Sequence, residues 1–212
     1  MNTRLALLPA LLALSAIPLL AQYKMEAIPS SPPDLPPAYA PLVQKQGYRV
    51  SGPNGAWIEV WPRTTLPAGT KSTEEAVSFP TIPQGALLAI VRFPGAGADR
   101  RGQPVKPGVY TLRYSMYPVN GDHQGVAPQR DFGLLTPIAE DKDPAATPAF
   151  EPLVAMSRKA SGTPHPAVLS IETPPGGAAF PSVNQEGDKD WSLSFKIGDT
   201  PMAIIVVGKS EA

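Results

Sequence analysis

Residues 106–117 read KPGVYTLRYSMY and decide the fold class of this chain. After a Pro-Gly turn, large apolar or aromatic side chains alternate with mostly polar ones. One face of the stretch would carry Tyr110, Leu112, Tyr114 and Met116, and the other Thr111, Arg113, Ser115 and Tyr117. A period of two residues is the spacing of a β-strand with two different faces. The stretch therefore predicts a long strand entered through a tight turn.

Shorter stretches of this kind recur along the chain, separated by many of its 28 prolines and 18 glycines. The strands that they predict cover residues 48–51, 56–61, 87–93, 131–136, 167–172, 191–197 and 202–207. Residues 87–93 are apolar at almost every position, as expected of a central strand buried on both faces. Short strands joined by turns favour antiparallel pairing. We therefore predict an all-β domain over residues 47–212, an antiparallel β-sandwich (immunoglobulin-like or similar) of eight or nine strands.

One short helix is predicted over residues 152–160. Pro152 suits the first helical turn, where its missing N–H costs nothing. Arg158 and Lys159 suit the last turn, because cations are favoured at a helix C-terminus. Gly162 then supplies the stop.

The N-terminal residues 1–21 have the pattern of a secretory signal peptide. A single cation, Arg4, precedes an apolar run over residues 5–20, and small Ala21 suits the position before cleavage at Gln22. A membrane anchor is the alternative, but the run is shorter than the ~20 residues that span a bilayer and contains prolines. We therefore predict a periplasmic or extracellular protein without a membrane span after signal cleavage.

Six prolines fall within residues 29–41. Proline cannot donate the backbone hydrogen bonds that a sheet needs, so this composition favours an extended spacer. Residues 22–46 are accordingly predicted to be a proline-rich linker.

The overall charge and the absence of cysteine exclude several classes of function. Eighteen basic and eighteen acidic side chains give a formal net charge of zero, which offers no field to attract nucleic acid. The chain has no cysteine, so disulfides, thiolate metal sites and thiol nucleophiles are absent. Its stability must come from packing.

Two stretches resemble known proteins. Residues 106–112 resemble the "PGxYTL" turn and strand of immunoglobulin-like and transthyretin-like secreted bacterial β domains, which implies a β-sandwich. The run from Asn120 through Arg130 to Thr163 is similar to uncharacterised exported proteins of soil bacteria such as acidobacteria. That second resemblance implies secretion and brings no assigned activity.

Residues 56–61 contain the first candidate site. Strand alternation would place Trp57, Glu59 and Trp61 on one face, where two indoles could stack on sugar rings and a carboxylate could bind their hydroxyls. The alternative is that both faces of this strand are buried, or that the proline-rich segment covers the indoles.

A second candidate site lies in the polar loop after residue 117. Asp122, His123 and Asp131 could hold a divalent metal ion, with His165 brought in by the fold, although their spacing matches no metal motif. The alternative is a turn in which His123 is an ordinary loop residue.

These observations favour a secreted or periplasmic, non-catalytic module that binds a carbohydrate polymer or a protein partner in the cell envelope, without a cofactor. The alternative is a metal-assisted hydrolase or oxygenase centred on the loop at Asp122 and His123, which would need one divalent metal ion. Hydrolytic motifs such as Gly-x-Ser-x-Gly are absent from the sequence.

Overall fold

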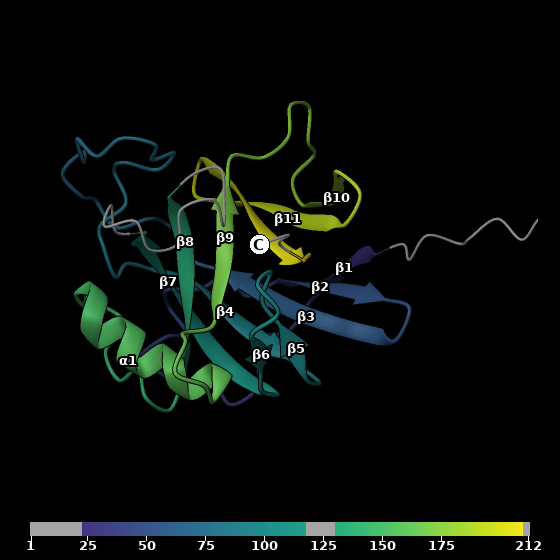
Figure 1. Cartoon of the computed structure of the whole chain (residues 1–212), viewed down its shortest axis with the longest axis horizontal. Coiled ribbons are helices and arrows are strands. Elements are labelled where there is room, and N and C mark those ends of the chain that lie inside the picture. Colours follow the sequence, from purple (N-terminus) through teal and green to yellow (C-terminus); the bar gives the residue numbers. More distant parts are fainter. Residues whose placement is uncertain (1–22, 118–129, 210–212) are drawn as a thin grey trace, which may run out of the picture.

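The computed structural model describes residues 23–117 and 130–209, and it is built almost entirely of β-strands (Figure 1). Ten strands form one antiparallel sheet in the order β1-β2-β3-β4-β7-β8-β9-β12-β11-β10. Their bounds are β1 Lys24–Ile28, β2 Gly47–Gly52, β3 Gly55–Pro62, β4 Leu87–Phe93, β7 Gly108–Met116, β8 Asp131–Pro137, β9 Val168–Glu172, β10 Ser182–Glu186, β11 Asp190–Ile197 and β12 Thr200–Val207. The short strands β5 (Gly97–Ala98) and β6 (Pro104–Val105) form a separate hairpin.

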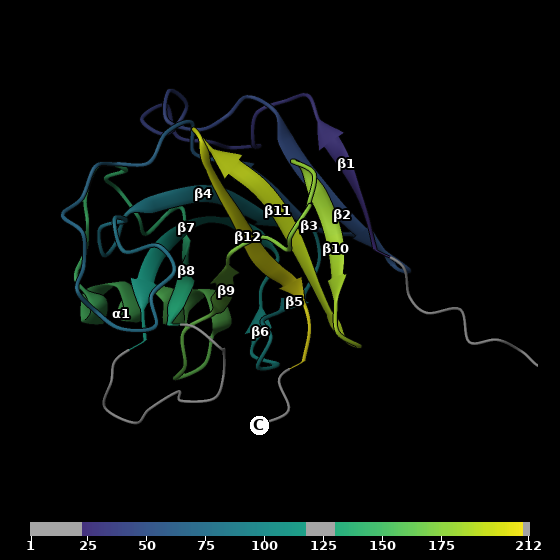
Figure 2. The ribbon, with the colours of Figure 1, turned by 90° about the horizontal axis from the view of Figure 1, so that it is seen from above.

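The sheet curls until it is nearly a closed barrel, which the view from above makes clear (Figure 2). Its two edge strands, β1 and β10, lie on the same side of the molecule in both views. Within the described residues no hydrogen-bonded ladder joins these two edges. We call the interval between them the seam.

The prediction of an antiparallel, all-β fold is confirmed, but the structure is not clearly a sandwich. A sandwich has two separate sheets, whereas here β9 joins both halves. Ser170 of β9 pairs with Phe132 of β8, and Glu172 of β9 pairs with Ala203 of β12. Hydrogen bonding therefore runs without interruption from β1 to β10.

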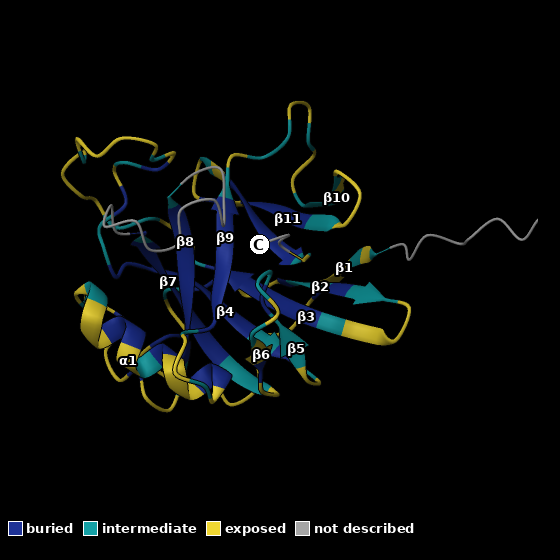
Figure 3. Ribbon diagram, in the orientation of Figure 1, coloured by how far each residue is buried: buried dark blue, intermediate teal, exposed yellow. Residues whose placement is uncertain are grey.

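The main core fills the interior of the barrel, and buried residues follow the strands closely (Figure 3). The alternation predicted for residues 109–117 appears in β7, where Tyr110, Leu112 and Tyr114 point into this core. The prediction that residues 87–93 are buried on both faces is also confirmed. In β4, Val91 belongs to the interior core and Ile90 to a second cluster outside the sheet.

Helix α1 (Phe150–Ser161) contains the predicted helix of residues 152–160. It packs on the outer face of β8, where Leu153 meets Leu134 in a third apolar cluster. Gly162 ends the helix in the left-handed conformation, with φ of 70°, and donates its N–H to Arg158. Within the described part of the chain, no helix has the length and apolar character needed to cross a membrane.

The proline-rich segment differs from the expected spacer, because it packs on the sheet. Its first part forms β1, which pairs with β2. Farther along, Tyr39 is only 1% exposed. The Tyr39 hydroxyl donates to the carbonyl of Asp141 at 2.9 Å. Tyr39 and Val43 cover the outward-facing Trp61, so the segment supplies one wall of the second apolar cluster.

Candidate functional site

Glu59, predicted to bind a ligand, lies at the centre of a ladder of charges on the outer face of the sheet. Its carboxylate is 2% exposed and accepts hydrogen bonds from Arg49 at 2.7 Å and Arg92 at 2.9 Å. Arg49 also donates to Glu26 at 2.8 Å. These residues lie opposite one another in the register of β1, β2, β3 and β4. Both carboxylate oxygens of Glu59 are therefore engaged within the sheet.

The two tryptophans of β3 do not share a face with each other. The register between β2 and β3 shifts after Val50, which pairs with Ile58, so Trp57 is an extra residue in β3. A bulge of this kind redirects a side chain. Trp57 packs against the interior core and donates its indole N–H to the carbonyl of Val206 at 2.7 Å. The predicted stripe of two indoles and a carboxylate is therefore not formed.

Trp61 lies on the outer face of the sheet, the same face as Glu59, but other residues cover it. Its indole is 1% exposed and donates its N–H to the carbonyl of Ser30 at 2.8 Å. The ring also lies over Gly47, where an added Cβ would be 2.5 Å from the indole nitrogen. Trp61 thus has no free ring face for a sugar, in agreement with the alternative that the proline-rich segment covers it.

Of the predicted metal ligands, Asp122 and His123 lie outside the described residues. Asp131, at the start of β8, is buried and has three donors. Its carboxylate accepts the N–H groups of Ser78 at 2.7 Å and Phe79 at 3.0 Å, and the hydroxyl of Tyr114 at 2.7 Å. Asp131 therefore anchors the loop before β4 to the barrel. Across residues 23–117 and 130–209, no cluster of three or more carboxylate or imidazole groups could hold a metal ion.

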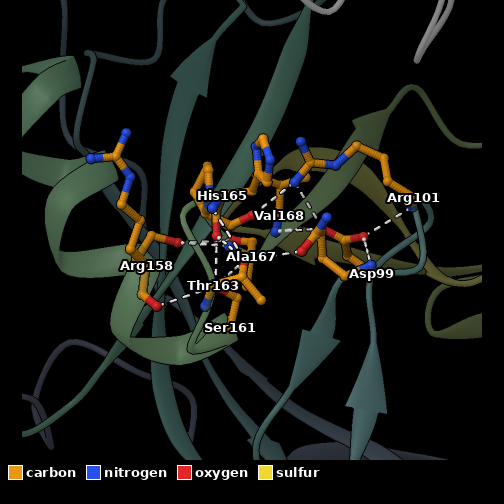
Figure 4. Close-up of polar contacts among 11 residues, drawn as sticks. Asp99, Arg101, Arg158, Ser161, Thr163, His165, Ala167 and Val168 are labelled. Carbon is orange, nitrogen blue, oxygen red and sulfur yellow. Dashed lines mark hydrogen bonds and ion pairs between the residues drawn. The ribbon is translucent and has the colours of Figure 1, made fainter.

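His165 lies in a polar network between α1 and the β5–β6 hairpin (Figure 4). The ring of His165 is exposed, while its carbonyl accepts the hydroxyl of Ser161 at 2.6 Å. On the other side of the network, buried Asp99 pairs with Arg101 at 2.9 Å and accepts the N–H of Val168 at 3.3 Å. These contacts hold loops together through backbone groups, so the network has a structural role.

The strongest candidate for a binding site is an open groove of about 340 Å³ at one end of the seam. We call it the seam groove. Its lining residues are Gln44, Tyr48, Thr64, Phe180, Pro181, Lys196 and Gly198. Tyr48 belongs to β2 and Lys196 to β11, so both margins of the sheet contribute.

Backbone contacts fix the two walls of the seam groove relative to each other. The side-chain amide of Gln44 donates to the carbonyl of Lys196 at 3.0 Å, and the N–H of Gly198 donates to the carbonyl of Thr64 at 3.0 Å. At the far end of the seam, the rings of Tyr23 and Trp191 lie 5.4 Å apart between centroids. The groove is therefore a preformed feature of the barrel.

The groove combines exposed aromatic surface with polar groups. Phe180 is 38% exposed, and within the described residues it is the one large apolar side chain that is exposed to solvent. The ammonium group of Lys196 lies 5.2 Å from the centre of its ring. Tyr48 completes the wall. Its hydroxyl donates to the side-chain oxygen of Gln44 at 3.4 Å, and burial raises the pKa of its phenol.

Sequence reasoning missed the seam groove. Its aromatic residue Phe180 follows the glycines and alanines of the connection from β9 to β10, which carries no strand pattern. Only the near-closure of the barrel brings Phe180 to Tyr48, more than a hundred residues earlier. The one available signal was an aromatic residue beside a proline in an otherwise small-residue loop.

Comparison of the chain with protein families, curated proteins and solved structures gives no match.

Proposed function

We propose that this protein is an exported, non-catalytic domain of the bacterial cell envelope that binds carbohydrate in the seam groove. Stacking of a sugar ring on Phe180, with hydroxyl groups bonded to the neighbouring polar side chains, would provide the affinity. A relationship to exported proteins of soil bacteria belongs to this proposal and rests on the run from Asn120 to Thr163, and an immunoglobulin-like or transthyretin-like character rests on the stretch at residues 106–112.

The observation that carries the proposal is the exposure of Phe180 beside polar groups in a preformed groove. Sugar rings present apolar C–H faces that pack on aromatic rings, while their hydroxyls need donors and acceptors nearby. Gln44 and Tyr48 supply such groups around Phe180. The groove volume of about 340 Å³ is that of a small-ligand site, in keeping with one or two sugar units of a longer chain.

Export is supported by the pattern of residues 1–21. Expression of the full chain in a Gram-negative host should yield a periplasmic or secreted protein whose first residue is Gln22. Cell fractionation followed by N-terminal sequencing tests this. Recovery of the protein in the cytoplasm with its N-terminus intact would contradict the export proposal.

Carbohydrate binding is tested with the mature protein, starting at Gln22, on a panel of neutral and acidic envelope and plant polysaccharides. At least one glycan should bind, and Phe180→Ala should weaken that binding about tenfold or more, the effect of losing one stacking contact. The thermal midpoint of the variant should stay unchanged, because Phe180 is 38% exposed.

Phe150→Ala is the matched control, since Phe150 is a partly buried phenylalanine at the start of α1, outside the groove. Its glycan binding should equal that of the unchanged protein. The proposal fails if no glycan binds, or if both phenylalanine variants bind as the unchanged protein does.

A further inference from the structure

We infer that the carbohydrate taken by the seam groove is acidic, a polymer of sugars that carry carboxylates, and that Lys196 is the residue that selects it. This inference rests on the proposed function and adds the class of ligand to it. The features that support it are the sign of the charge in the groove, the position of that charge over the Phe180 ring, and the anchoring of its backbone.

The charge in the groove has one sign. Among the seven lining residues, Lys196 alone carries a formal charge, and its side chain is exposed. Within residues 23–117 and 130–209, no carboxylate forms an ion pair with Lys196, although most cations on the sheet have such a partner. The site is therefore complementary to an anion and has no internal counter-ion to compete with it.

The position of the ammonium group suits a sugar acid. It lies over the Phe180 ring, 5.2 Å from the ring centroid, in a cation–π contact that places positive charge at the aromatic surface of the groove. A sugar stacked on Phe180 would bring a carboxylate on the ring within reach of this cation. A neutral sugar could pack in the same way, but it would offer the ammonium group no opposite charge.

The backbone of Lys196 is held in place. Gln44 donates to the Lys196 carbonyl at 3.0 Å, across the seam, and Lys196 pairs with Pro201 in the β11–β12 ladder. The cation therefore projects from a fixed strand end. Such pre-positioning lowers the entropy lost on binding, so a single exposed charge can contribute to selectivity.

The test compares two soluble oligosaccharides of equal length, an oligo-uronate and its neutral counterpart, by calorimetric titration of the mature protein. The oligo-uronate should bind more tightly, and Lys196→Gln should weaken its binding about two- to fivefold, the usual effect of one exposed ion pair. Binding of the neutral oligosaccharide should not change. Added salt should weaken oligo-uronate binding to the unchanged protein and have little effect on the variant.

Lys142→Gln is the matched control, because Lys142 is an exposed lysine outside the groove. It removes the same net charge and should leave both affinities unchanged. Equal weakening by both lysine variants would show a general charge effect and overturn the inference. Binding of both oligosaccharides that depends on Phe180 and not on Lys196 would also overturn it, while the proposed function would stand. Absence of all binding would contradict both the inference and the proposed function.

Discussion

Several charged residues whose types are common in catalytic or binding sites stabilise this sheet instead. Arg113 of β7 is fully buried and forms paired contacts with Asp141, one of them at 2.8 Å. Its remaining N–H groups donate to the backbone carbonyls of Gly85, before β4, and of Asp143 and Ala146, in the loop before α1. Asp131 and Glu59 are used in the same way. Their residue types could be read from the sequence, but their partners could not, because each partner lies on another strand or loop.

The charge ladder gives a prediction for Glu59. Glu59→Gln should lower the free energy of unfolding by about 2 kcal/mol, because Arg49 and Arg92 would lose a shared, buried partner while remaining partly open to water. Urea denaturation measures the change. Glu26→Gln, at the exposed end of the ladder, should cost less than about 0.5 kcal/mol. Equal costs for the two variants would contradict this account.

Buried tyrosines predict that the protein loses stability in alkali. Burial raises the pKa of the Tyr39 and Tyr114 phenols, assisted by the nearby carboxylates of Asp141 and Asp131. In the unfolded chain these phenols titrate near pH ~10, so the unfolded state loses the protons first. The free energy of unfolding should therefore keep its full value below about pH 10 and decrease above it.

Urea denaturation from about pH 8 to about pH 11 measures this fall. Tyr114→Phe removes one of the titrating groups and should make the fall less steep, although it also removes the hydrogen bond to Asp131. A free energy that stays level over this range, or that falls equally in the variant, would contradict the role given to these phenols.

At the scale of elements, the sequence predicted those with a clear period and missed those that depend on tertiary contacts. Strand β7 and helix α1 follow their side-chain patterns. Edge strand β10 has one apolar residue, Val183, and so lacks the alternation that marks a strand. The bulge at Trp57 inverts the face of that one residue, which a strict period of two cannot anticipate.

The proline-rich segment gives a prediction at this scale. Replacement of residues 30–42 by a glycine–serine sequence of equal length should lower the free energy of unfolding by at least about 3 kcal/mol, because it uncovers Trp61 and deletes Tyr39. The same replacement of residues 174–179, a largely exposed connection, should cost much less. Urea denaturation compares the two. If residues 30–42 were only a spacer, the two replacements would lower the free energy of unfolding equally. That result would contradict the packing described for this segment.

At the scale of the whole molecule, one sheet surrounds one interior core that runs from Val50 in β2 to Val206 in β12. Because strands from both ends of the chain share this core, we expect the described region to unfold in a single cooperative transition. Trp61 and Trp191 report on opposite halves of the sheet. In variants that keep only one of these two tryptophans, with the other one and Trp57 replaced by phenylalanine, the fluorescence transition should coincide with the circular dichroism transition. Separate transitions for the two signals would indicate two independent units.

The seam groove also belongs to this scale, since it exists only because the sheet fails to close completely. Its polar wall comes from residues 44–48 and its aromatic wall from residues 180–181. No local pattern links these segments, and the fold class alone does not say where a curled sheet leaves its edges apart. The sequence therefore could not predict this groove or its place.

The most direct test of the central claim is a nuclear magnetic resonance titration of the isotope-labelled mature protein with an oligo-uronate. The account predicts that the amide signals that shift are those of the non-proline residues lining the seam groove, which are Gln44, Tyr48, Thr64, Phe180, Lys196 and Gly198. Shifts confined to another face, or no shifts with any acidic or neutral oligosaccharide, would contradict it.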